Sequence, residues 1–215
     1  MATYLITGAN RGIGAAMDSL LVNRGDSVIG TARNHPEYLS LDVTDPESQN
    51  AMSRQLAGRC IDTLVCNAGV YLDKGETLAG GFPAQMWADS FAANVTGVFL
   101  SVQALLPNLQ MSADPKIAII SSQMASHTRA PGGSYIYRAS KAAALNLGRN
   151  LATDLRKLNI AVGIYHPGWV KTDMGGDAAD ISVEDSAAGL VNRFDALSMK
   201  TTGCFETWDG KQHPF

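Results

Sequence analysis

Tyr137 and Lys141 are the two side chains whose types and spacing are best suited to proton transfer. They stand four residues apart in a segment predicted to be helical, so both side chains lie on one helical face. A tyrosine hydroxyl has a pKa near ~10 and donates a proton poorly unless its anion is stabilised. A lysine ammonium nearby favours the phenolate and lowers that pKa. The spacing predicts a general acid, and the alternative is a half-buried aromatic residue beside a surface charge.

A hydroxyl that holds the reacting oxygen is expected near this pair. Ser121 and Ser122 close the fifth predicted strand, at the sheet end where ligands bind in open parallel sheets. We assign Ser122 to this role because it ends the strand. Ser121 and Ser126 remain alternatives.

Glycines mark a second site after the first predicted strand. Gly8, Gly12 and Gly14 give the spacing G-x-x-x-G-x-G at the start of a predicted helix. Glycine is needed where the backbone approaches a phosphate or where a helix packs closely on a strand. The free N–H groups of a helix start then favour a pyrophosphate. The turn, with Asn10, Arg11 and Ile13 between the glycines, is predicted to bind a dinucleotide, and a plain turn is the alternative.

The end of the second strand bears on the kind of dinucleotide. An acidic residue there would accept hydrogen bonds from a ribose 2′-hydroxyl and favour NAD. Here the strand ends Gly30-Thr31-Ala32-Arg33, without an acid. Arg33, together with Arg11 in the glycine turn, offers positive charge to a 2′-phosphate. This pattern favours NADP(H).

Short apolar runs alternate with helical stretches and would position these residues. Such alternation is typical of βαβ units, and we predict a doubly wound, Rossmann-type α/β fold with about seven parallel strands and helices on both faces. The predicted strands are Tyr4–Thr7, Ser27–Thr31, Tyr38–Leu41, Thr63–Cys66, Lys116–Ser121, Ile160–Tyr165 and one around Cys204–Thr207. The predicted helices run from the glycine turn to Arg24, from Pro46 to about Ala57 after an Asp45 N-cap, from Pro83 to about Leu106, from Ser134 to about Leu158, and from a Ser182 cap to about Leu197.

Composition narrows the class of protein. The 215 residues suit one domain, 1–215, and 46 % hydrophobic with 17 % charged residues argues against disorder. A net charge of -3 offers no broad attraction for nucleic acid or membrane surfaces, and no apolar run approaches the ~20 residues of a membrane span. The start of the chain lacks the pattern of a signal peptide, so we expect a cytoplasmic protein. The odd number of cysteines and the spacing of the histidines predict neither a disulfide framework nor a metal site.

Further segments complete a family resemblance. Leu41-Asp42-Val43, Cys66-Asn67-Ala68-Gly69, Phe91-Ala92-Ala93-Asn94-Val95 and His166-Pro167-Gly168-Trp169-Val170-Lys171-Thr172 occur in order with the motifs above. With them the chain resembles the short-chain dehydrogenase/reductase family over nearly its whole length. The pair Tyr137-Arg138, the segment Gly175-Gly176 and the ending from Trp208 to Phe215 resemble its C-signal and sniffer-like carbonyl reductase branch.

The resemblance implies roles for these segments. It implies NADPH-dependent reduction of a ketone, aldehyde or quinone by Ser122, Tyr137, Lys141 and Asn94, with Asn94 as the fourth catalytic residue in a relay through water and lysine. It implies that Asp42, beside Val43, contacts the adenine, and that Val170 and Thr172 contact the nicotinamide carboxamide. The remaining residues implied to bind cofactor are Asn67, Ala68, Gly69, Pro167 and Gly168, together with Tyr137 and Lys141 themselves. A homodimer or homotetramer is implied as well.

The chain departs from the family pattern before Tyr137. The interval from Ser122 is 15 residues, slightly longer than usual, and the usual interval would land on Met124. We place the extra residues in the loop Ser126–Gly133, which contains proline and glycine. Two other functions stay open: a non-enzymatic NADP(H)-binding regulatory protein, and an isomerase or epimerase, which the glycine spacing disfavours.

Residues around the predicted site receive lesser roles. The segment from Lys171 to Ser182 contains paired glycines and small residues, and it is predicted either to close over substrate or to be an ordinary connection. The predicted pocket walls are Trp169, Met174, Gln123 and Met124. We interpret His166 as structural and His127 as a solvated loop residue.

Overall fold

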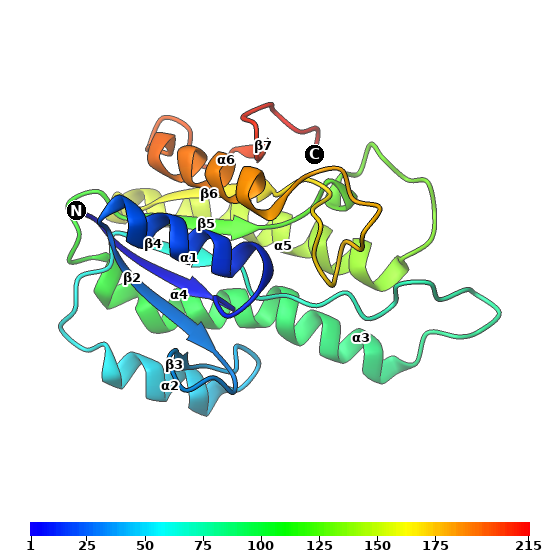
Figure 1. The fold of residues 1–215 in the computed structure, drawn as a ribbon, viewed down its shortest axis with the longest axis horizontal. Coiled ribbons are helices and arrows are strands. Elements are labelled where there is room, and N and C mark those ends of the chain that lie inside the picture. The colour runs from blue at the N-terminus through cyan, green and yellow to red at the C-terminus, as the bar shows by residue number, and fades with distance from the viewer.

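Seven parallel strands form the centre of the molecule. The computed structural model describes residues 1–215, and its strands pair in the order β3-β2-β1-β4-β5-β6-β7 (Figure 1). The order changes direction between β1 and β4, which leaves a crevice at the carboxyl ends of these two strands. This confirms the predicted doubly wound fold. The strands are β1 Thr3–Thr7, β2 Ser27–Ala32, β3 Leu39–Ser40, β4 Thr63–Cys66, β5 Lys116–Ile120, β6 Ala161–His166 and β7 Phe205–Thr207.

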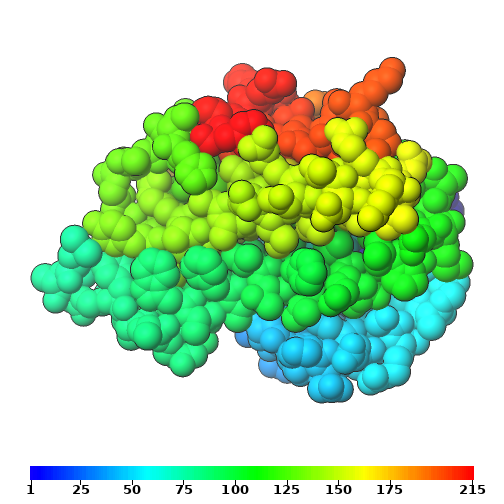
Figure 2. All heavy atoms as spheres, turned by 180° about the vertical axis from the view of Figure 1, so that it is seen from behind, coloured from blue at the N-terminus to red at the C-terminus, as the bar shows by residue number.

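Helices cover both faces of the sheet. The front face in Figure 1 carries α1 (Gly12–Arg24) and α6 (Val183–Ala196), which pack against each other. The opposite face carries α2 (Pro46–Gln55), α4 (Gly97–Leu109) and α5 (Tyr135–Asp154). Figure 2 shows this second face from behind, with the cyan, green and yellow-green helices hiding the sheet.

The alternation of side chains along β1 divides the core into two layers. Leu5 packs toward α2, α4 and α5, while Tyr4 and Ile6 pack toward α1 and α6. All three side chains are almost fully buried. Burial on both faces explains why the strands read as continuous apolar runs.

The helix predicted from Pro83 to Leu106 is longer and less regular than expected. It comprises α3 (Ala84–Phe91), a π-helical turn η1 (Ala92–Thr96) and α4. At 26 residues, Ala84–Leu109 is long and apolar enough to cross a membrane by length and composition. In this fold its apolar residues Val98, Val102 and Leu105 are instead buried against the sheet. The α4 part of the segment is therefore a core helix here.

Local signals placed most element ends correctly. The carboxylate of Asp45 caps α2 by accepting from the Glu47 N–H at 3.0 Å, and the Ser182 hydroxyl caps α6 by accepting from the Asp185 N–H at 3.0 Å. The predicted helix from Ser134 to Leu158 is present as α5 followed by a 3₁₀ turn, η3 (Leu155–Leu158). A second 3₁₀ turn, η2 (Gln123–Ala125), follows β5 and was not predicted.

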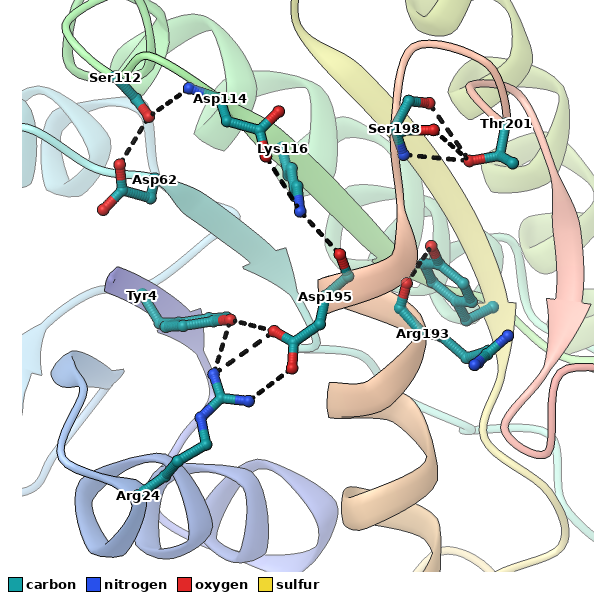
Figure 3. A network of polar contacts seen from close by, with 11 residues as sticks. Tyr4, Arg24, Asp62, Ser112, Asp114, Lys116, Arg193, Asp195, Ser198 and Thr201 are labelled. Atoms are coloured by element: carbon teal, nitrogen blue, oxygen red, sulfur yellow. Dashed lines mark hydrogen bonds and ion pairs between the residues drawn. The ribbon is translucent and has the colours of Figure 1, made fainter. Parts of the chain in front are cut away.

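A polar cluster joins the helices at the amino ends of the strands (Figure 3). The Asp195 carboxylate accepts from the Tyr4 hydroxyl at 2.8 Å and from the Arg24 guanidinium at 2.6 Å. The Lys116 ammonium donates to the Asp195 backbone carbonyl at 3.0 Å. These bonds tie the ends of α1 and α6 to β1 and β5, at the edge of the sheet away from the predicted site.

Three long loops gather at the other edge. Residues 67–83, 121–134 and 167–182 leave the carboxyl ends of β4, β5 and β6 and lie at the same end of the molecule (Figure 1). Parallel strands bring these loops together because their carboxyl ends all meet at one edge.

Candidate active site

A cleft of about 880 Å³ opens at the carboxyl ends of the central strands. Segments that follow six strands, β1 to β6, contribute to its wall, so residues far apart in sequence meet there. The predicted residues on the wall are Gly8, Asn10, Arg11, Gly12, Ile13, Gly14, Arg33, Asp42, Val43, Asn67, Ala68, Gly69, Tyr137, Lys141, Pro167 and Thr172. Ser122, Asn94, Gly168 and Val170 do not form part of this wall.

The glycine turn is tightly packed and leaves backbone hydrogen-bond donors free at the start of α1. A Cβ on Gly14 would stand 2.2 Å from the Gly8 carbonyl oxygen and 2.7 Å from the Asn67 side-chain nitrogen. Gly8 has a φ of 68°, in the left-handed region that favours glycine. Helix α1 begins at Gly12, and the Arg11 side chain does not cap it. The first N–H groups of α1 therefore remain available to an anion at the cleft.

Asn67 holds the glycine turn in this shape. Its side-chain amide donates to the carbonyl oxygens of Thr7 and Gly8, both at 3.0 Å. In return, the Thr7 hydroxyl accepts from the backbone N–H groups of Asn67 and Ala68, both at 3.0 Å. The amide of Asn67 thus fixes the cleft wall. Thr7 stands directly before the glycine spacing and belongs to the same hydrogen-bond network, a role that was not predicted for it.

Asp42 and Arg33 line the part of the cleft beyond β2. One Asp42 carboxylate oxygen accepts from the Thr44 N–H at 2.9 Å and from the Thr44 hydroxyl at 2.7 Å. Partial burial raises the pKa of Asp42, but the Thr44 bonds and the Arg33 charge outweigh it, and the net shift is downward. Asp42 is therefore an ionised hydrogen-bond acceptor at neutral pH.

Arg11 pairs with the loop that follows β6. Its guanidinium lies 3.0 Å from the Asp173 carboxylate, and the two side chains are 63 % and 84 % exposed. Exposed ion pairs of this kind contribute only ~0–1 kcal/mol. The pair spans the entrance between the glycine turn and the 167–182 loop, and it can open at little cost.

Tyr137 and Lys141 are buried together on α5, as the four-residue spacing predicted. They are 8 % and 5 % exposed, and the Lys141 ammonium lies 5.7 Å from the centre of the Tyr137 ring. The Lys141 ammonium donates to the Ile120 carbonyl at the end of β5, at 3.0 Å. This bond holds the lysine over the strand end that faces the cleft.

Burial shifts the pKa values of the two groups in opposite directions. It raises the pKa of Tyr137 to about 12, with Ser122 as a nearby hydrogen-bond donor opposing the shift and the Tyr71 hydroxyl adding to it. Burial lowers the pKa of Lys141 to about 8. At neutral pH the tyrosine therefore holds its proton and most of the lysine is charged. The prediction that Lys141 lowers the pKa of Tyr137 is wrong for the protein without cofactor, because burial raises this pKa and the lysine, 5.7 Å from the ring centre, does not offset it.

The structure distinguishes the three serines. The Ser121 hydroxyl donates to the Lys141 backbone carbonyl at 3.1 Å, so it is occupied although Ser121 contributes to the cleft wall. Ser126 hydrogen-bonds with Thr128 at 2.8 Å and with the Phe215 carbonyl at 3.3 Å. Ser122 accepts from the Met124 N–H at 3.1 Å and is the serine that acts on the pKa of Tyr137, although the two hydroxyls form no hydrogen bond of normal geometry. The assignment of Ser122 to the reacting oxygen therefore stays a prediction.

Asn94 lies in the π-helical turn and is fully engaged. Its side-chain amide donates to the Val70 carbonyl and to the Ser140 hydroxyl, and its oxygen accepts from the Val70 N–H, all at 2.9 Å. A Cβ on Gly69 would face both the Asn94 oxygen and the Lys141 ammonium, at 2.9 and 3.3 Å. The fold thus brings Asn94 and Lys141 to the same side of Gly69, without a direct bond between them.

The Pro-Gly segment after β6 forms the far side of the cleft. The Pro167 carbonyl accepts from the Ser186 hydroxyl at 2.7 Å, which ties the segment to α6. Val170 is 4 % exposed and pairs with Ile181 as an isolated bridge, so its side chain packs behind the wall. Thr172 reaches the wall itself.

The segment from Lys171 to Ser182 is held in place by contacts from both sides. Asp173 pairs with Arg11, and the Met174 carbonyl accepts from the Lys74 ammonium at 3.0 Å. The Trp169 indole donates to the Gly175 carbonyl at 3.0 Å. Of the four residues expected to form pocket walls, Met174 lines the cleft, whereas Gln123 and Met124 lie in η2 and Trp169 is 45 % exposed.

The remaining titratable residues form no second reactive centre. No three His, Cys, Asp or Glu side chains are close enough to hold a metal ion, and Cys60, Cys66 and Cys204 are free thiols. Burial, with the Arg129 guanidinium acting in the same direction, lowers the pKa of His166 to about 4, so its ring is neutral at neutral pH.

Comparisons with known proteins agree with this geometry. A family model described as short chain dehydrogenase matches residues 2–181. The chain is 33 % identical to 1-hydroxy-2-glutathionyl-2-methyl-3-butene dehydrogenase from Rhodococcus sp. (strain AD45), covering 98 % of both chains. It is 36 % identical to C-signal of Myxococcus xanthus, covering 72 % of this chain and 93 % of the relative.

Solved structures show the same similarity. The NADPH-bound carbonyl reductase from chicken fatty liver superposes with a TM-score of 0.91 at 29 % identity, covering 100 % of this chain and 99 % of the other. The carbonyl reductase Sniffer of D. melanogaster superposes with a TM-score of 0.93 at 26 % identity, covering 100 % of both. The resemblance found in the sequence motifs is thereby confirmed.

Proposed function

Because the chain belongs to the short-chain dehydrogenase family, we propose that it reduces the carbonyl of a ketone, aldehyde or quinone with NADPH. The observation that carries this proposal is the buried pair of Tyr137 and Lys141 beside a cleft shaped for a dinucleotide. A protein that only binds a nucleotide has no need of a tyrosine and a lysine buried together at its cleft. The carbonyl reductases among its structural neighbours support the same reaction class.

The residues of the cleft fit a nicotinamide dinucleotide. The free N–H groups at the start of α1 suit a pyrophosphate, and the close packing of Gly14 on the Gly8 carbonyl and the Asn67 amide holds the turn that presents them. Asp42 would accept from the adenine, Lys141 and Tyr137 would lie near the nicotinamide ribose, and Thr172 near the carboxamide. When bound, NADPH supplies the hydride that reduces the carbonyl carbon.

The chain itself supplies the proton and the orientation. Ser122 hydrogen-bonds the carbonyl oxygen, and Tyr137 donates its proton to that oxygen. The resulting phenolate is stabilised by the charged Lys141 ammonium. Asn94 belongs to the relay that returns a proton from solvent by way of Lys141, and its bonds to Val70 and Ser140 hold that region in place.

The preference for NADPH rests on charge at the end of β2. Arg33 follows the last residue of that strand and lines the cleft, where an NAD-binding fold would have an acid. A guanidinium favours a 2′-phosphate by charge-assisted hydrogen bonds. Arg11 adds a second positive group when its exposed pair with Asp173 opens.

The decisive assay follows NADPH oxidation with a panel of ketones, aldehydes and quinones. We expect turnover with NADPH, weaker turnover with NADH, and loss of turnover in Tyr137→Phe with NADPH binding kept. Substantial activity in Tyr137→Phe would overturn the assignment of the proton donor. Tight NADPH binding without turnover on any carbonyl would favour a regulatory NADP(H)-binding protein, a function that the similarity to C-signal makes worth testing.

The setting of the reaction follows from the same proposal. We take residues 1–215 as one catalytic domain acting on a small carbonyl compound in the cytoplasm, without a nucleic acid, membrane or metal partner. Assembly as a homodimer or homotetramer is part of the proposal and is measured by light scattering at several protein concentrations.

A further inference from the structure

We propose that Asp73 and Tyr71 are positioning residues that hold the start of α5, and with it the ring of Tyr137, in its reactive place. This inference rests on the proposed reductase function and adds two residues to its machinery. Both belong to the loop that follows the Asn67-Ala68-Gly69 segment, and no motif in the sequence marks them.

Asp73 is a carboxylate placed inside the protein. It is 0 % exposed, and it forms no ion pair with a basic side chain. Its two oxygens accept instead from the backbone N–H groups of Ile136 at 2.8 Å and Tyr137 at 3.1 Å. These are the second and third residues of α5, where the N–H groups of a helix lack partners within it. The carboxylate therefore caps the helix from a distant loop.

The residue that would normally cap this helix cannot do so. Ser134 occupies the N-cap position, but its φ is 48° and its hydroxyl makes no capping bond. That hydroxyl is hydrogen-bonded to the Tyr71 hydroxyl instead. A serine in the left-handed region is uncommon. The start of α5 thus depends on Asp73 and Tyr71 rather than on its own N-cap.

Tyr71 also contacts the proposed proton donor directly. Its ring stacks on the ring of Tyr137, with centroids 4.2 Å apart and planes inclined by 22°. The same loop reaches the core at Val70, whose N–H and carbonyl are both bonded to Asn94. Residues 70, 71 and 73 therefore connect Asn94, the Tyr137 ring and the Tyr137 backbone in one continuous clamp.

The consequence is mechanical. Ser122 follows the end of β5 in the chain, and Lys141 is held at the same strand end by its hydrogen bond to the Ile120 carbonyl. Tyr137, by contrast, stands on the first turn of α5. Without the clamp that turn frays, and the hydroxyl of Tyr137 moves relative to the other two groups. A misplacement of ~1 Å costs about 100-fold in rate. The clamp should therefore act on turnover and leave cofactor binding alone.

The test compares kcat, the NADPH Kd and the unfolding temperature in four variants. Asp73→Ala removes both bonds, and Asp73→Asn keeps one acceptor and serves as the fallback if the alanine variant does not fold. Tyr71→Phe keeps the stacked ring, and Tyr71→Leu removes it. We expect kcat to fall about 10- to 100-fold in Asp73→Ala and Tyr71→Leu, less in Asp73→Asn and Tyr71→Phe, with the NADPH Kd within about 3-fold throughout.

Asp195→Ala is the matched control because it removes a carboxylate that stabilises the opposite edge of the sheet (Figure 3). It should lower the unfolding temperature and leave kcat within about 2-fold. If Asp73→Ala keeps kcat within about 2-fold, the inference is wrong. It is equally wrong if Asp73→Ala and Asp195→Ala lower kcat alike for the same loss of unfolding temperature.

A spectroscopic arm separates this inference from the proposed reaction. In protein labelled with ¹³C at tyrosine Cζ, the Tyr137 resonance is identified by its loss in Tyr137→Phe. We expect Asp73→Asn and Tyr71→Leu to shift this resonance and to bring its titration to lower pH as the ring gains solvent, with Asp195→Ala unchanged. If wild-type protein reduces no carbonyl, the reductase proposal fails, and an unmoved Tyr137 resonance in both variants would still overturn the clamp.

Discussion

Replacing Gly14 with alanine tests the dinucleotide cleft at its tightest point. In an unconstrained helix this change would stabilise the protein by about 1 kcal/mol, because glycine has the lower helix propensity. Here the new Cβ would stand 2.2 Å from the Gly8 carbonyl oxygen, when real Cβ contacts are essentially never under 3.0 Å. The turn must therefore retreat by about 0.8 Å. The second contact, 2.7 Å from the Asn67 amide, blocks an easy shift to that side.

The retreat displaces the backbone N–H groups that would face the pyrophosphate. A misplacement approaching 1 Å weakens the effect of well-aligned groups by about 100-fold. We therefore expect the NADPH Kd to rise about 100-fold, which is a loss of about 2.7 kcal/mol in binding free energy. Overpacking should also reduce stability by about 1–3 kcal/mol.

Fluorescence titration and calorimetry with NADPH measure the affinity, and urea unfolding measures the stability. Gly25→Ala is the control, because Gly25 ends the same helix with a φ of 92° and has open space around its Cβ position. It should lower stability without weakening NADPH binding. NADPH binding within about 3-fold of wild type in Gly14→Ala would refute the assignment of this turn as the pyrophosphate site.

Three further changes test other parts of the structure. Arg33→Ala should raise the NADPH Kd about 10-fold or more and leave the NADH Kd nearly unchanged, as measured by titration with both; equal losses would contradict a 2′-phosphate contact. Burial lowers the pKa of Lys141 from 10.5 to about 8 in the folded protein. Between these pH values the unfolded chain binds more protons at this group than the folded protein does, so the free energy of unfolding rises with pH. Urea unfolding should show the free energy of wild type relative to Lys141→Met increasing by roughly 2 kcal/mol from pH 8 to pH 10, and a flat difference would contradict a buried, charged lysine. Asp195→Ala removes partly exposed bonds to Tyr4 and Arg24 and should lower the unfolding free energy by about 1–2 kcal/mol with kcat unchanged; a loss of activity would show that the amino-end cluster communicates with the site.

Local chemistry was readable from the residues alone. The caps at Asp45 and Ser182, the apolar strands and the four-residue spacing of Tyr137 and Lys141 depend on neighbours a few positions apart. The glycine spacing and the absence of an acid before Arg33 are also local signals, because each involves only the few residues of a single turn. The order of motifs along the chain was therefore enough to predict the fold class and the family.

Element details that depend on packing were harder to predict. Strand β3 has only two residues where four were expected, and a π-helical turn interrupts the long helix that carries Asn94. Neither feature has a local signal in the sequence. The length of a strand depends on the partner strand that is available, and the π-helical turn accompanies the hydrogen bonds of Asn94 to Val70 and Ser140. The sequence could not show that the Ser121 hydroxyl donates to the Lys141 carbonyl, because this bond joins the end of β5 to the middle of α5.

The sequence by itself determined which chemical groups this protein has and roughly where along the strands they stand. Only the tertiary structure decided how those groups are held. Asp73 reaches α5 across 63 residues of chain, and Arg11 meets Asp173 across 162. Such pairings follow from where loops converge at one edge of a sheet, and spacing in a sequence carries no record of that convergence.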